Sequence, residues 1–141
     1  LQILHALDPS PVAEVRATGI NVLSPKIDIA NARVELASGC VANLTASRVS
    51  SEKVRKLRVF GERSYCSLDY QTQEIKRYRL EAGGPEPEIL ADAPDVTPYE
   101  PLRAELEAFL AACRGQAVRY ADGAAGRRAL ETALSLVAAI G

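Results

Sequence analysis

The sequence of 141 residues contains few of the residue types on which metal sites, disulfide frameworks and nucleic-acid-binding surfaces depend. It has no methionine or tryptophan, 1 histidine and 3 cysteines, and its formal net charge is -1. The lack of a basic excess argues against nucleic-acid binding, which needs a positively charged face. No run approaches the roughly 20 apolar residues that cross a bilayer, and residues 1–7 lack the features of a signal peptide. We therefore expect a cytoplasmic protein that binds neither nucleic acid nor a membrane.

Histidine and cysteine are too scarce for the common catalytic and metal-binding sites. His5 lies in an apolar helical pattern, and no serine occupies a Gly-x-Ser-x-Gly elbow, which argues against a hydrolytic triad. Cys40, Cys66 and Cys113 are widely spaced, which fits neither a disulfide framework nor a zinc site. We expect no metal, three buried thiols, and a His5 that is packed or partly exposed.

Glycine-rich phosphate loops are also absent, because Gly83 and Gly84 lie among prolines and acids rather than between a strand and a helix. The chain is nevertheless 48% hydrophobic, enough for one core without metals or disulfides, so we expect residues 1–141 to form a single domain. The patterns predict the end of a helix over residues 1–7 and two closing helices that begin at Pro101 and after Asp122. They predict strands over 12–22, 28–36, 40–48, 56–60, 64–70 and 73–80, with a short edge strand at 88–91.

Residues 28–48 have the clearest pattern, that of a β-hairpin turning near Gly39. One face of its first strand is apolar, with Ala30, Ala32, Val34 and Leu36. The other face mixes polar and apolar side chains, namely Ile29, Asn31, Val41, Asn43, Thr45 and Ser47. That face is too polar for a core and suits a hydrated interface or the floor of a sugar site.

The two closing helices carry apolar stripes. The first stripe consists of Leu102, Leu106, Phe109, Leu110 and Cys113, and the second consists of Leu130, Ala133, Leu134, Val137 and Ile140. Strands followed by helices indicate an α+β fold. We expect an open, largely antiparallel sheet with helices on one face, and with the other face free for substrate or subunit contact.

Four residues are candidates for substrate binding, and none is a candidate for catalysis or cofactor binding. Lys26 and Asp28 follow a proline at a strand start and could form a cleft pair. Asn31 lies on the polar face, and Arg48 opens a basic stretch over 48–58 that could hold a phosphorylated or nucleotide-linked substrate. The interpretation that we favour for the basic stretch is a solvated strand edge, whose cations discourage edge pairing.

The order of these pieces resembles the C-terminal domain of the glucose-fructose oxidoreductase, inositol dehydrogenase and MocA family. The likeness covers nearly the whole chain and is carried by Ser10–Val15, the hairpin 28–48, Lys56–Gly61, and Tyr99–Phe109 leading to Asp122–Gly123. Ser24–Lys26 before the hairpin and Ala46–Arg48 near its end resemble bacterial members that act on UDP-linked amino sugars.

The resemblance implies an NAD(P)-dependent oxidoreductase that acts on sugars, inositols or nucleotide-linked sugars. It implies an N-terminal Rossmann domain that holds NAD or NADP and the catalytic lysine, and a second domain that shapes the substrate pocket and makes a homo-oligomer through its open sheet face. The family's catalytic histidine precedes the position of His5, so that role is not transferred. We therefore expect this chain alone to bind no cofactor and to be inactive.

An alternative from another class also fits the sequence. A non-enzymatic interaction domain could use the same open sheet face to dimerise, without any oxidoreductase partner domain.

Overall fold

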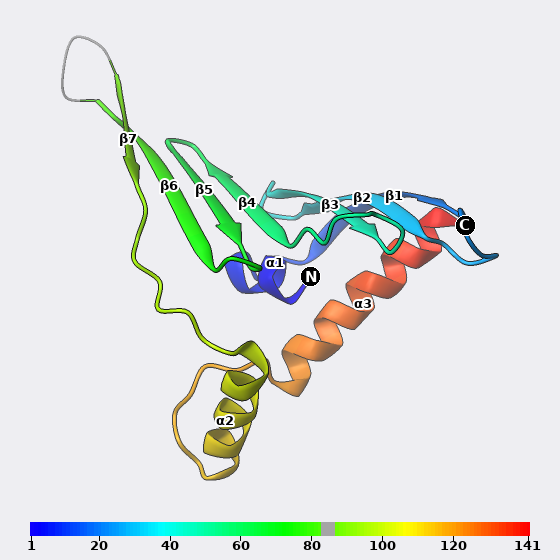
Figure 1. Cartoon of the computed structure of the whole chain (residues 1–141). Coiled ribbons are helices and arrows are strands. Elements are labelled where there is room, and N and C mark those ends of the chain that lie inside the picture. The colour runs from blue at the N-terminus through cyan, green and yellow to red at the C-terminus, as the bar shows by residue number, and fades with distance from the viewer. Residues whose placement is uncertain (83–86) are drawn as a thin grey trace. The chain divides into compact units, whose positions relative to one another are not determined.

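The computed structural model describes residues 1–82 and 87–141 and shows an α+β chain (Figure 1). It contains two compact units, one made of residues 1–51 and 108–141 and the other of residues 52–107. Each unit holds one antiparallel sheet. The sheet of the first unit is called sheet A below, and the sheet of the second is called sheet B.

Sheet A has three strands in the order β1 (Val12–Ile20), β2 (Ile29–Leu36) and β3 (Val41–Ser47). The turn between β2 and β3 contains Gly39 at a φ of 88°, a left-handed conformation that glycine adopts without strain. The predicted hairpin is confirmed, and β1 ends two residues earlier than the expected strand.

The core of the first unit lies on the apolar face of β2, as the alternation predicts. Val34 is 0% exposed and Leu36 is 1% exposed. Helix α3 (Gly123–Ile140) packs against β1, and α1 (Gln2–Leu7) packs against α3. The expected N-cap is confirmed, because the Asp122 carboxylate accepts a hydrogen bond of 2.8 Å from the amide of Ala125.

The predicted buried face of α3 is wrong for three of its members, because Leu130, Leu134 and Val137 are each 59% exposed. The side that packs consists of Ala129, Thr132, Ala133, Leu136 and Ile140, which are buried or half-buried. The size of the side chains determines which side of α3 is buried, because the small residues on this side let the helix approach the strand closely.

His5 is one of the few buried polar residues of the first unit, at 8% exposure. Its Nε2 lies 2.8 Å from Oγ1 of Thr132, and that hydroxyl donates a hydrogen bond to the carbonyl of Arg128. A hydroxyl has a single proton to donate, so Nε2 of His5 carries the proton in their contact. The expectation of a packed histidine is confirmed.

Sheet B has four antiparallel strands, β4 (Lys56–Gly61), β5 (Ser64–Asp69), β6 (Glu74–Glu81) and β7 (Glu88–Asp92). The short edge strand is confirmed as β7, which pairs with β6. Phe60, Tyr65 and Tyr78 stand in one cross-strand row with ring centroids 4.8 and 5.6 Å apart.

Helix α2 (Pro101–Cys113) begins at the predicted proline and has no buried residue. Its apolar stripe is therefore exposed. The expectation of buried thiols is wrong, because Cys40 and Cys113 are exposed and Cys66 is half-buried. Cys40 directly follows the turn glycine, and Cys113 ends this exposed helix.

The α+β class is confirmed, but the strands form two hydrogen-bonded sheets rather than one. The glycine pair at 83 and 84 lies outside the described residues. Across the described ranges, no helix is both long enough and apolar enough to cross a membrane.

Candidate substrate-binding end of sheet A

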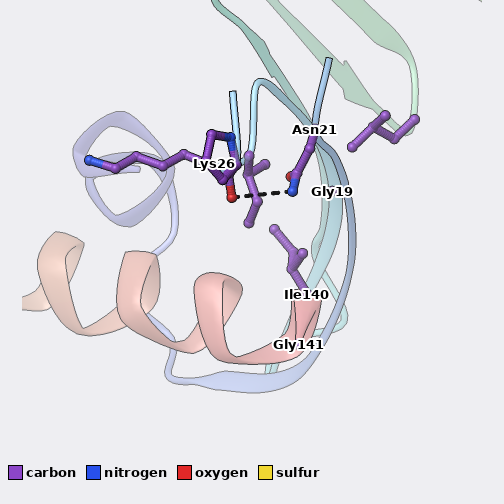
Figure 2. A pocket seen from close by; sticks show the side chains of 8 residues that line it. Gly19, Asn21, Lys26, Ile140 and Gly141 are labelled. Atoms are coloured by element: carbon purple, nitrogen blue, oxygen red, sulfur yellow. Dashed lines mark hydrogen bonds between the residues drawn. The ribbon is translucent and has the colours of Figure 1, made fainter. Parts of the chain in front are cut away.

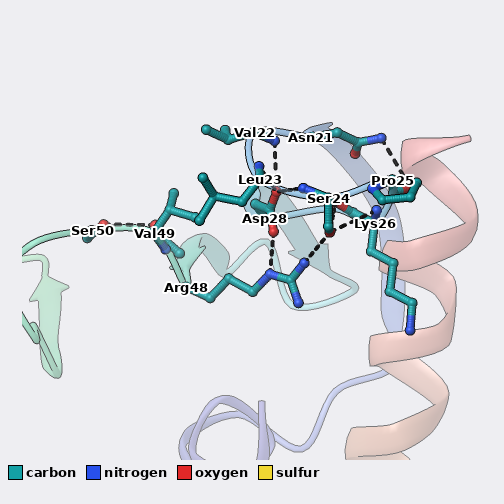
Figure 3. Close-up of polar contacts among 11 residues, drawn as sticks. Asn21, Val22, Leu23, Ser24, Pro25, Lys26, Asp28, Arg48, Val49 and Ser50 are labelled. Carbon is teal, nitrogen blue, oxygen red and sulfur yellow. Dashed lines mark hydrogen bonds and ion pairs between the residues drawn. The ribbon is translucent and has the colours of Figure 1, made fainter.

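The loop between β1 and β2 is organised around one buried carboxylate, that of Asp28. Asp28 is 3% exposed, and its Oδ2 accepts hydrogen bonds from the amides of Val22 at 2.8 Å, Leu23 at 2.7 Å and Ser24 at 3.3 Å (Figure 3). The amide of Asp28 in turn donates to the carbonyl of Ile20 at 2.9 Å. The carboxylate thus fixes the path of the loop.

Arg48 closes the same cluster from the end of β3. The hairpin register pairs Ile29 with Ser47, which brings the preceding Asp28 beside the following Arg48. Nε of Arg48 donates to the other carboxylate oxygen of Asp28, and Nη2 donates to the hydroxyl of Ser24. The Arg48 side chain stays 55% exposed while that of Asp28 is 0% exposed, so the guanidinium shields the carboxylate from solvent.

The hydrogen bonds to Asp28 determine its charge. The amides of Leu23 and Val22, together with Arg48, lower the pKa of Asp28 to about 2, against the opposing effect of burial. Asp28 is therefore a permanent anion near neutral pH. Because both carboxylate oxygens are occupied, its chemistry is structural: it positions the loop and the Arg48 guanidinium rather than transferring a proton.

Lys26 belongs to the same loop but points away from Asp28 (Figure 3). It borders an open hollow of about 730 Å³ between the β1 end, the loop and the end of α3 (Figure 2). The lining residues are Gly19, Ile20, Asn21, Pro25, Lys26, Ile27, Ile140 and Gly141. The lining combines the apolar side chains of Ile20, Ile27 and Ile140 with the polar residues Asn21 and Lys26, whose side chains extend in different directions (Figure 2). A mixed lining of this kind suits a ligand with both apolar and anionic parts.

Asn31 lies on the opposite face of sheet A. Its neighbour Ala30 stands in register with Gly19, which meets Ile140 of α3, and successive side chains of a strand point to opposite faces. The Asn31 side chain accepts a hydrogen bond of 3.0 Å from the hydroxyl of Thr45, its partner in the register. The polar open face is thus present as predicted.

The structure brings three of the four predicted residues to one end of sheet A and leaves Asn31 on its open face. The expected pairing of Lys26 with Asp28 is not formed, because Arg48 is the partner of Asp28. Sequence reasoning missed Ser24, whose hydroxyl accepts from the Lys26 amide at 3.1 Å and so joins Lys26 to the cluster. The available signal was a serine directly before a proline, since a serine hydroxyl in a turn commonly accepts a hydrogen bond from the backbone two residues further on.

The described residues do not form the familiar binding site for a dinucleotide cofactor. The familiar site for NAD(P) needs parallel strands joined by a helix, with a glycine loop at the start of that helix. Every strand pair in the described ranges is antiparallel.

Comparison with known proteins identifies an oxidoreductase relative. The chain is 37% identical over 142 residues to UDP-N-acetylglucosamine 3-dehydrogenase of Acidithiobacillus ferrooxidans, and the match covers 99% of this chain and 45% of the relative. The crystal structure of that enzyme superposes with a TM-score of 0.88 at 34% identity, covering 99% of this chain and 44% of that chain. The chain therefore spans less than half the length of these relatives.

A more distant solved structure shares the fold. Aldose-aldose oxidoreductase from Caulobacter crescentus superposes with a TM-score of 0.73 at 21% identity, over 99% of this chain and 42% of that one. No family model matches the sequence. The match to UDP-N-acetylglucosamine 3-dehydrogenase, a sugar oxidoreductase, supports the resemblance to the glucose-fructose oxidoreductase, inositol dehydrogenase and MocA family. The Caulobacter enzyme shows a shared fold.

Proposed function

We propose that this chain is the substrate-binding and oligomerisation domain of an NAD(P)-dependent oxidoreductase acting on a sugar or a nucleotide-linked amino sugar. The match to a UDP-N-acetylglucosamine 3-dehydrogenase over 99% of the chain supports the substrate class. In this proposal NAD or NADP is held by a Rossmann domain outside these residues, the homo-oligomer forms through the open face of sheet A, and the protein acts in the cytoplasm.

The observation that carries the proposal is the preorganised loop at the end of sheet A. Asp28 fixes the loop through three backbone amides, and the loop places Lys26 beside the hollow while Arg48 is held close by. Nucleotide-linked sugars carry a diphosphate, which guanidinium and ammonium groups recognise through charge-assisted hydrogen bonds. Binding groups fixed before the ligand arrives lose little entropy on binding.

Hydride transfer needs the nicotinamide and the substrate carbon in close register. The residues described here supply walls, cations and orientation for the substrate. Residues 1–141 alone should accordingly show no saturable binding of NADH in a fluorescence titration, and tight binding would place a cofactor site within this chain.

The test uses the complete protein that contains this chain, assayed with NAD+ or NADP+ and UDP-N-acetylglucosamine by the absorbance of the reduced nicotinamide. Lys26→Ala should raise KM about ten- to a hundredfold, because a hydrogen bond to a charged group contributes about 1.5–3 kcal/mol. Lys76→Ala removes an exposed lysine of β6, outside both the loop and the basic stretch, and should leave KM unchanged.

An unchanged KM in Lys26→Ala would remove Lys26 from the substrate site. Turnover of a free sugar but not of the UDP-sugar would keep the oxidoreductase and reject the nucleotide-linked substrate. Absence of turnover with every sugar tested, together with self-association, would favour the non-enzymatic interaction domain.

A further inference from the structure

The charged residues of sheet A are sorted by sign into two rows. Glu14 of β1 lies directly opposite Glu35 of β2, and Arg16 lies directly opposite Arg33. These four are the only charged residues of the three strands. The acidic row and the basic row are two residues apart along the strands, which corresponds to about 6.6–6.8 Å.

Both rows lie on the open face of the sheet. Val34, which sits between Arg33 and Glu35, is fully buried on the α3 side, so its two neighbours point the other way. Glu14, Arg16, Arg33 and Glu35 together line one shallow hollow on this face. The side chains of Arg16 and Glu14 are 74% and 48% exposed, so their charged ends are available to a partner.

This sorting is unfavourable in a single chain. Like charges placed directly opposite each other on neighbouring strands destabilise a sheet, whereas alternating signs would stabilise it. The chain relieves part of the repulsion, because Arg16 pairs with Glu14 along β1 at 2.6 Å and is also attracted by Glu35 of β2. Across the strands, Nη1 of Arg33 donates a hydrogen bond of 3.5 Å to the side-chain oxygen of Asn43, which carries no charge. An arrangement that costs stability within the chain calls for a compensating contact outside it.

We infer that the open face of sheet A binds the same face of a second copy of this chain, in the register where each acidic row meets the basic row of the other copy. The inference rests on the proposed oligomerisation through this face and adds to it the register of the two copies and the four charged residues that set it.

The symmetry of the two rows favours a second copy over an unrelated partner. A half turn about an axis that lies between the facing sheets, parallel to the rows and midway between them, exchanges the two rows. Glu14 of one copy then faces Arg16 of the other, and Glu35 faces Arg33. The surface is self-complementary, as a twofold interface requires.

The residues beside the charged rows are compatible with a partly hydrated interface. The next row along the strands consists of Thr18, Asn31 and Thr45, which carry no charge, and the last two share a hydrogen bond. Interfaces of this polarity bind through direct hydrogen bonds and bridging waters. The charged rows therefore determine the register of the contact.

Charge reversal in the complete protein tests the inference by sedimentation, without substrate or cofactor. Glu14→Arg with Glu35→Arg makes both rows basic, and Arg16→Glu with Arg33→Glu makes both acidic. Each double variant should weaken self-association through this face by at least about a hundredfold, because like charges brought together across an interface cost several kcal/mol. An equimolar mixture of the two variants should associate again, since opposite charges then face each other in every pair.

Two controls separate charge pairing from misfolding. The variant with all four reversals exchanges the rows and should associate like the wild type. Glu52→Arg with Glu105→Arg makes the same change of charge at exposed sites outside sheet A and should have no effect. Circular dichroism confirms the fold of each variant.

If both double variants associate as strongly as the wild type, the charged register is rejected and the oligomerisation proposal stands. Failure of the mixture to associate, with both variants folded, would reject it as well. A monomeric wild type at high micromolar concentration would overturn the inference and the oligomerisation proposal together. The substrate-binding proposal would stand or fall separately, on the KM of Lys26→Ala.

Discussion

At Gly19, the end of α3 comes close to sheet A, and replacing this glycine with alanine tests how tightly the two pack. A Cβ on Gly19 would lie 2.7 Å from Cγ2 of Ile140 and 2.9 Å from Cγ2 of Ile27. Carbon atoms in favourable contact are about 3.5–4.0 Å apart. Both neighbours are β-branched and have stiff χ1 angles, so neither methyl can rotate away freely.

The expected loss follows from this crowding. Overpacking by one methyl group costs typically about 1–3 kcal/mol. Against it stands the gain of about 0.4–1 kcal/mol that alanine provides by restricting the unfolded chain. We expect Gly19→Ala to lower the free energy of unfolding by about 1–2 kcal/mol, measured by urea denaturation followed by circular dichroism.

Two further variants make the test specific. Gly126→Ala in α3 introduces the same methyl where nothing lies within 4 Å, and it should raise stability by about 0.5–1 kcal/mol through helix propensity. Ile140→Ala removes the nearer obstacle, so Gly19→Ala should cost less in that background. Equal losses in both backgrounds, or a Gly19→Ala variant as stable as the wild type, would refute the proposed clash.

Two predictions concern pH. Because the pKa of Asp28 is lowered from 3.8 to about 2, its contribution to stability is present above pH 3.8 and is lost as the pH falls towards 2; Asp28→Asn should flatten urea-unfolding curves over that range, and an unchanged slope would contradict the assignment. Burial and the nearby Arg128 lower the pKa of His5, so its contribution is complete above pH 6.5 and falls as the medium becomes more acidic. His5→Gln should make the free energy of unfolding less sensitive to acid in the same assay. A steeper fall of stability with pH in the variant would contradict the predicted direction of the His5 pKa shift.

The hairpin 28–48 was predictable because apolar and polar residues alternate along it with the two-residue period at which side chains of a strand change face. Alternation in β2 directs Val34 and Leu36 to the core and Asn31 to the open face, and the turn needs a residue that tolerates a left-handed φ, which Gly39 is. Local pattern and tertiary packing agree there, so the sequence alone suffices.

The buried side of α3 was not predictable in the same way. The helix has apolar residues around much of its circumference, so hydrophobicity does not select one side. The contact with β1 is close, as Gly19 shows, and it admits Ala129 and Ala133 in preference to the larger Leu130 and Leu134. The shape of the partner decides the orientation, and that shape is known only once the strand is in place.

In the candidate site too, neighbours in sequence were a poorer guide than residues that the fold brings together. Lys26 and Asp28 are neighbours in sequence, and proximity suggested a pair. The predicted hairpin already placed Arg48 at the same end as Asp28, and a charged side chain that is 0% exposed needs a partner with matching geometry. The planar guanidinium of Arg48 donates to Asp28 and Ser24 at the same time, a fixed geometry that the ammonium of a lysine lacks. Register is therefore a better guide to this ion pair than sequence spacing.

Successive side chains of each strand point to opposite faces, so sheet A carries the two proposed functions on different faces. Residues on the α3 side, such as Gly19, shape the hollow beside Lys26, while the intervening residues, such as Arg16, form the charged rows on the open face. Substitutions that lie far apart and share no partner have additive effects. Lys26→Ala should therefore change KM equally in wild-type and row-exchanged protein, whereas unequal changes would show that assembly of the subunits helps to shape the substrate site.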